Sequence, residues 1–173
     1  MIDDNLIGQL KAFILKRYEL VDKPGLGKIS GYVGGMHTKS SRTFEGLTDA
    51  LTGFIKKERK SETFSTMLER LRTEKGMTAA QLYNGAWVKK QLYSKIMGER
   101  NYHPSKNTVI AFGLSLKLDG QSMDDLLESA GYRFSNSSIA DLVILFCLDL
   151  GLYDLHDVNA LLLSVDQRVL CRE

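Results

Sequence analysis

Residues 76–97 decide the fold, and they read GMTAAQLYNGAWVKKQLYSKIM. Gly76 is a natural helix stop. Thr78 with Gln81 three residues later matches a capping box, in which the Thr hydroxyl accepts from the Gln amide and the Gln side chain reaches back. Apolar spacing then predicts a short helix, a turn and a second short helix over 89–97. Two short helices joined by a tight turn indicate a helix-turn-helix unit.

Helical periodicity continues on both sides of this unit. An apolar stripe from Phe64 predicts a helix before it, and the segment 139–150 is apolar around nearly its whole circumference, so it must be buried. Capping residues stand where the later helices are expected to begin: Ser105 after Pro104, Ser122, Ser137 or Ser138, and Asp154. No alternating pattern of useful length follows residue 60, so the sequence predicts an all-α domain.

The first 60 residues differ in character from the rest. Apolar residues at helical spacing predict a helix over 2–21, and a glycine-rich stretch at 24–43 indicates a loop. We therefore expect an N-terminal helical arm with a Gly-rich loop at 1–60, and a helical domain at 61–173.

Charge is distributed unevenly along the 173 residues, although the formal net charge is only +2. Residues 60–110 carry nine basic and four acidic side chains, a net +5, whereas residues 111–173 carry four and ten, a net −6. A basic middle followed by an acidic end favours one face for a polyanion and another for a different partner.

Several function classes are disfavoured by composition. The longest apolar run, 142–148, is far shorter than the roughly 20 residues of a membrane-spanning helix, and no signal peptide opens the chain. Two unpaired cysteines, Cys147 and Cys171, fit a reducing, cytoplasmic setting. The histidines are scattered, and neither a zinc spacing nor a phosphate loop is present. The sequence predicts no metal, no cofactor and no enzyme activity.

Local features fall in one register from residue 64 to residue 130: Gly76 before the second helix, the Thr78 cap, the turn Ala86-Trp87-Val88, the end of the third helix at Ser94-Lys95-Ile96, and Pro104-Ser105 opening the fourth. They resemble the lambda-repressor/Cro-like helix-turn-helix domains, also called the xenobiotic-response-element family. The resemblance implies a repressor-like five-helix core with two additional C-terminal helices and the N-terminal arm. It also implies a bacterial or phage DNA-binding regulator of transcription.

A second resemblance covers residues 63–170. The matching segments are Thr63-Phe64-Ser65, Glu74-Lys75-Gly76, Leu92-Tyr93-Ser94-Lys95-Ile96, Pro104-Ser105-Lys106, Ala130-Gly131-Tyr132, Ser137-Ser138, Tyr153-Asp154 and Asp166-Gln167. They resemble a C-terminal helical module of bacterial multidomain proteins, where it follows macro-like or kinase-like domains. This resemblance implies that the acidic last helices belong to the same domain, and a regulatory or targeting role.

In the DNA-binding interpretation, helix 89–97 enters the major groove and its outward side chains meet base edges. Gln91 suits adenine and a lysine suits guanine, while phosphates are met by basic residues and by amides at a helix N-terminus. The candidate DNA-binding residues are Thr78, Lys89, Lys90, Gln91, Ser94, Lys95, Arg100, Lys106 and Asn107. Dimerisation would place two copies on two half-sites.

An alternative function is a protein-interaction or adaptor module on the same scaffold, in a bacterial signalling or defence system. Trp87 stands where the family commonly has glycine or asparagine, so it is strained or lies in a differently shaped turn. Ala79 replaces a polar residue that contacts DNA in many members. The acidic C-terminal helices are then a candidate surface for a protein partner.

Overall fold

The computed structural model describes residues 4–21, 48–49, 51–54, 62–99 and 102–171. In these ranges the regular structure is helical and contains no strand, which confirms the all-α prediction. The Gly-rich loop expected at 24–43 lies outside the described residues. Within the described ranges, no helix is both long and apolar enough to cross a membrane.

The helix boundaries follow the sequence pattern closely. The elements are α1 (Asp4–Val21), α3 (Phe64–Glu74), α4 (Ala79–Gly85), α5 (Lys90–Gly98), α6 (Lys106–Ser115), α7 (Gly120–Ser129), α8 (Ile139–Asp149) and α9 (Leu155–Ser164). A short helical stretch at 48–49 and 51–54 falls in a separate compact unit, Pro24–Ser61.

Side-chain caps explain why most of these helices begin where they do. Thr63, Thr78, Ser105, Ser138 and Asp154 each accept a hydrogen bond from an amide in the first turn of the next helix. Such a cap satisfies an amide that has no partner within the helix. The helix pattern was therefore readable from these polar residues.

The expected start of α7 at Ser122 is wrong. Asp119 is the N-cap, and its carboxylate accepts from the amide of Ser122 at 2.8 Å. Ser122 is thus inside the first turn. The carboxylate is favoured there because it is a good N-cap and carries the charge that suits a helix N-terminus.

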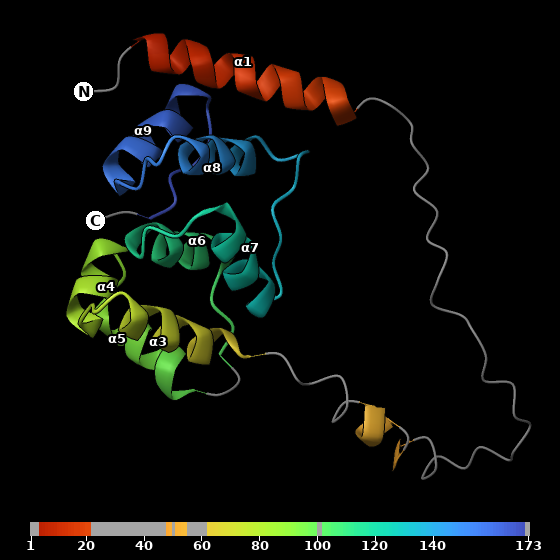
Figure 1. The fold of residues 1–173 in the computed structure, drawn as a ribbon, viewed down its shortest axis with the longest axis vertical. Coiled ribbons are helices and arrows are strands. Elements are labelled where there is room, and N and C mark those ends of the chain that lie inside the picture. Colours follow the sequence, from red (N-terminus) through yellow and green to blue (C-terminus); the bar gives the residue numbers. More distant parts are fainter. Residues whose placement is uncertain (1–3, 22–47, 50, 55–61, 100–101, 172–173) are drawn as a thin grey trace, which may run out of the picture. The chain divides into compact units, whose positions relative to one another are not determined.

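The helices of the larger unit stack in layers (Figure 1). Helix α1 packs on α8, α8 packs on α9 and α7, α7 packs on α6 and α3, and α4 packs on α6 and α5. The larger unit therefore comprises Met1–Lys23 together with Glu62–Glu173. The structure divides the predicted arm 1–60, because α1 belongs with the C-terminal helices and only the segment after it forms a separate unit.

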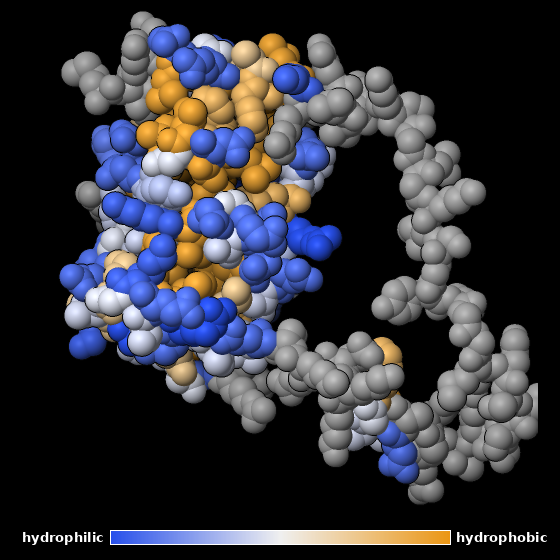
Figure 2. All heavy atoms as spheres, viewed as in Figure 1, coloured by the Kyte–Doolittle hydropathy of each residue, from blue (hydrophilic) through white to orange (hydrophobic). Residues whose placement is uncertain are grey.

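One core runs through these layers. Phe112, Leu82, Leu126 and Val143 are fully buried, and Leu10 brings α1 into the same core. Helix α8 is buried on nearly every side, as its composition predicts. Figure 2 shows hydrophilic residues gathered over α3, α4 and α5, while apolar residues reach the surface near α1 and α8.

Candidate nucleic-acid interface

The turn between α4 and α5 sets the start of α5. The amide of Trp87 donates to the carbonyl of Asn84 at 3.0 Å, and that of Val88 donates to Tyr83 at 2.8 Å, which closes α4. Trp87 has φ 53°, in the left-handed region that bulky residues rarely adopt. Val88 is buried beneath the turn, and Lys89 follows as the N-cap of α5.

Helix α5 begins without a side-chain cap. Lys89 makes no capping hydrogen bond, unlike the N-cap residues of α3, α4, α6, α7, α8 and α9. The first-turn amides of α5 therefore have no side-chain acceptor in the described part of the chain. An exposed helix start of this kind is suited to an external anion, since the amides and the helix dipole both favour negative charge.

The outward face of α5 carries the residues predicted for it. Tyr93 and Ile96 point into the core, and the residues between them and around them are exposed: Lys89, Lys90, Gln91, Ser94 and Lys95. Among the described residues, none of the three lysines has a carboxylate within ion-pair distance. The ammonium of Lys95 lies 4.8 Å from the ring centroid of Tyr102. The face is cationic and is not neutralised from within.

The remaining predicted residues are not all on this face. Lys106 binds the buried carboxylate of Asp141 at 2.5 Å and lies over the Phe134 ring, so its charge is used inside the protein. This ion pair is at odds with a phosphate contact by Lys106. Asn107 is exposed beside it on α6. Arg100 lies outside the described residues.

Thr78 performs a structural task. Its hydroxyl accepts from the Gln81 amide at 3.2 Å, and the Gln81 side chain accepts from the Thr78 amide at 2.8 Å. This is the capping box that the sequence predicts. Helix α4 has seven residues, too few to make its start a strong anion site on its own.

The sequence does not predict the hydrogen-bond network that lies beneath α5. Arg72 donates through Nε to Glu69 at 2.9 Å and through Nη1 to the carbonyl of Met77, and the Tyr93 hydroxyl donates to Glu69 at 3.4 Å. Hydrogen bonding by Arg72 lowers the pKa of the Glu69 carboxyl, whereas burial raises the pKa of Tyr93. The spacing of Glu69 and Arg72 indicates a pair on one helix face, but nothing in the sequence links that pair to Tyr93.

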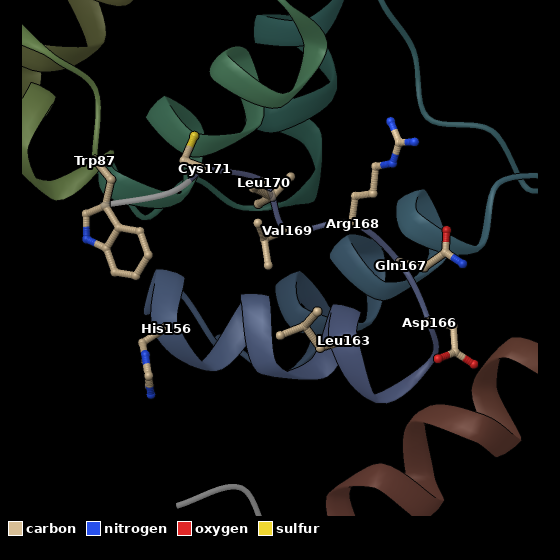
Figure 3. A pocket seen from close by; sticks show the side chains of 9 residues that line it. All are labelled: Trp87, His156, Leu163, Asp166, Gln167, Arg168, Val169, Leu170 and Cys171. Atoms are coloured by element: carbon tan, nitrogen blue, oxygen red, sulfur yellow. The ribbon is translucent and has the colours of Figure 1, made fainter.

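A groove lies between Trp87, in the α4–α5 turn, and residues of α9 and the C-terminal segment (Figure 3). Its volume is about 1070 Å³, and the residues that line it are Trp87, His156, Leu163, Asp166, Gln167, Arg168, Val169, Leu170 and Cys171. Trp87 and His156 lie at one end and Asp166 at the other. Leu163 is 60% exposed in this groove. The buried side chain of Asn159 holds the C-terminal segment that lines the groove. Its amide nitrogen donates to the carbonyl of Cys171, and its oxygen accepts from the backbone amide of Leu170.

The described residues contain no group of three or more His, Cys, Asp or Glu side chains arranged to hold a metal ion. No family model, curated protein or solved structure matches the chain in comparisons with known proteins.

Proposed function

We propose that the helices α3 to α7 are a repressor-like helix-turn-helix domain that binds duplex DNA through α5, as a transcriptional regulator of bacterial or phage type. The supporting observation is the start of α5, where uncapped amides and the exposed side chains of Lys89 and Lys90 occur together. Nine residues of α helix are about 14 Å long, which suits insertion into the major groove.

The outward side chains have distinct roles in this proposal. Gln91 is the candidate reader of adenine, because its amide can donate to and accept from that base edge. Lys89 and Lys90 neutralise phosphate or read guanine, and Ser94 adds a contact to either. Asn107 remains a candidate phosphate contact, whereas Lys106 is reassigned to an ion pair with the buried carboxylate of Asp141.

The test compares two pairs of lysines. The variant Lys89→Gln/Lys90→Gln removes charge from α5, and Lys11→Gln/Lys16→Gln removes the same charge from exposed positions of α1. Fluorescence anisotropy with a labelled duplex of about 20 base pairs is measured from about 50 to 200 mM salt. We expect the α5 variant to bind at least about tenfold more weakly and to lose about one unit of salt slope for each phosphate contact removed.

The α1 variant should retain affinity within about twofold, because surface charges far from the contact are screened by salt. Equal losses in both variants would mean that the binding face is not α5. Absence of binding by the wild type at low salt would overturn the proposal. Light scattering of the complex then gives the number of copies per duplex, and hence whether two protomers bind two half-sites.

A second candidate function is a protein-interaction module, and the groove beside Trp87 favours it. Tryptophan is enriched among the residues that anchor protein interfaces, and the exposed Leu163 lines the same groove. The substitution Leu163→Asp should abolish capture of a partner while leaving DNA affinity unchanged, and Lys89→Gln/Lys90→Gln should do the reverse. Capture that is lost on nuclease treatment would show that the partner is bridged by nucleic acid.

A further inference from the structure

The Arg72 network joins three helices at the point where they meet. Arg72 and Glu69 lie on α3, Met77 lies immediately before the N-cap of α4, and Tyr93 lies in the middle of α5. The guanidinium uses separate N–H groups for its two partners: Nε and Nη2 hold the Glu69 carboxylate, and Nη1 holds the Met77 carbonyl. The planar guanidinium of Arg72 therefore links Met77, just before α4, to Glu69, whose carboxylate accepts the hydrogen bond from Tyr93.

Apolar packing alone would leave α5 less well fixed. The Tyr93 ring lies 6.2 Å from Phe112 and 5.7 Å from Tyr83, and Ile96 is buried nearby. These contacts hold α5 against the core, but burial of apolar area is non-directional. A hydrogen bond is directional, so the bond from Tyr93 to Glu69, long at 3.4 Å, favours one placement of α5 relative to α3.

We propose that Arg72 is a positioning residue for DNA binding: it orients α5 through Glu69 and Tyr93 without touching DNA. This inference rests on the proposed function of α5. Tyr93 is one helical turn from Lys89 and Lys90, so a shift of α5 at Tyr93 moves the cationic start of the helix directly. Arg72 is only 20% exposed and both ends of its fork are engaged within the protein, which leaves it no role as a phosphate ligand.

The neighbouring Arg70 provides a matched control on the same helix. It pairs with Glu62 at 3.0 Å and with Glu74 at 2.9 Å, both at the surface, and these partners lie on α3 or just before it. Arg70 thus carries the same charge and is also paired, with two carboxylates where Arg72 has one carboxylate and one carbonyl. Among the described residues, its partners do not extend to α4 or α5.

The experiment uses the full chain and the anisotropy assay described above. We expect Arg72→Met to bind the duplex about tenfold more weakly, the size of effect that follows from losing a charged hydrogen bond, and Arg70→Met to stay within about twofold. Tyr93→Phe keeps the ring and removes only the hydroxyl, and it should weaken binding in the same direction. All measurements are made well below the melting temperature of each variant, with helix content checked by circular dichroism.

Two further readouts separate positioning from a merely structural role. In a double-mutant cycle, adding Tyr93→Phe to Arg72→Met should cause little further loss, because both changes break the same connection. Amide hydrogen exchange in α5 should increase in Arg72→Met and not in Arg70→Met, without DNA present. Additive losses, or unchanged exchange in α5, would overturn the inference.

The charge-conserving variant Arg72→Lys completes the test. A lysine cannot hold the carboxylate and the carbonyl as a planar fork does, so affinity should stay low. The inference would be overturned if Arg72→Lys restored both the affinity and a unit of salt slope that Arg72→Met had lost. That result would mean that residue 72 contacts phosphate itself. A wild type that fails to bind refutes the DNA-binding proposal, whereas a wild type and an Arg72→Met variant that bind equally refute only the positioning role.

Discussion

Helices α5 and α6 each begin at a lysine, Lys90 in one and Lys106 in the other. At α6 the N-cap Ser105 accepts from the first-turn amide of Thr108, and Lys106 binds the buried Asp141. At α5 the N-cap makes no side-chain bond and Lys90 is exposed. A lysine at a helix start is therefore structural where a buried carboxylate faces it, and is available to an external anion where none does.

The largest effect should follow from breaking the ion pair at α6. Lys106→Met removes the cation that pairs with the carboxylate of Asp141, whose side chain is 8% exposed. Among the described residues, this carboxylate then keeps one hydrogen-bond donor, the backbone amide of Ser135. We expect the free energy of unfolding to fall by about 2 kcal/mol, less than for a fully buried pair because Lys106 is a quarter exposed. Urea unfolding measures this difference.

Two controls define the contrast with α5. Arg133→Met removes one partner of a fully surface pair, 4.0 Å from Glu128, and should leave stability unchanged. Lys89→Gln/Lys90→Gln should also leave stability unchanged while lowering DNA affinity. A loss of stability in that α5 variant equal to the loss in Lys106→Met would remove the distinction between the two helix starts.

The next largest change in stability should follow from giving α5 a carboxylate N-cap like Asp119 of α7. Lys89→Asp places a capping carboxylate where Asp119 stands relative to α7. The variant should gain about 1 kcal/mol of stability, because a first-turn amide acquires an acceptor. It should also lose DNA binding, since the new carboxylate occupies those amides and reverses the charge. Thermal unfolding and anisotropy on the same sample measure the two changes, and Lys89→Gln controls for loss of the lysine alone.

Local signals explain how much of the fold was predictable. Caps, helix stops and the capping box of Thr78 and Gln81 depend on residues within one turn of each other, and these predictions are confirmed except at the start of α7. Asp119 was missed because Ser122 is also a good capping residue, and only the register of the helix decides between them. The exposed face of α5 was predictable because Tyr93 and Ile96 define its buried side.

Long-range contacts explain what was missed. Lys106 and Asp141 are 35 residues apart, and Glu69 and Tyr93 are 24 apart. Helical periodicity indicates which side of a helix is buried, but it does not tell which charged residue of another helix lies opposite. The packing of α1 on α8 has the same cause, since apolar faces are non-specific until the topology is known.

A smaller effect is expected at the turns. The α6–α7 turn follows the same path as the α4–α5 turn: Lys117 has φ 52° where Trp87 has φ 53°, and an apolar residue and an N-cap follow each. Lys117→Gly should stabilise the protein by about 0.5–1 kcal/mol, because glycine adopts this conformation without strain. Gly76→Ala should have the opposite effect at φ 63°, where the added Cβ meets no other atom within 4 Å. Thermal unfolding compares the two, and equal signs would contradict a backbone origin.

The smallest expected effect is pH-dependent and concerns the network under α5. The pKa of Glu69 is lowered in the folded protein, mainly by the hydrogen bonds from Arg72, so its carboxylate stabilises the fold above the ordinary value of 4.5. That contribution is lost as the pH falls through the lower folded-state pKa, because the carboxyl is then protonated in both states. Glu69 is 44% exposed, so screening limits the contribution to about 0.5 kcal/mol. Glu69→Gln should flatten the acid side of the stability curve, measured by urea unfolding between neutral pH and the acid limb. An unchanged slope would mean that Arg72 does not favour the charged form of Glu69.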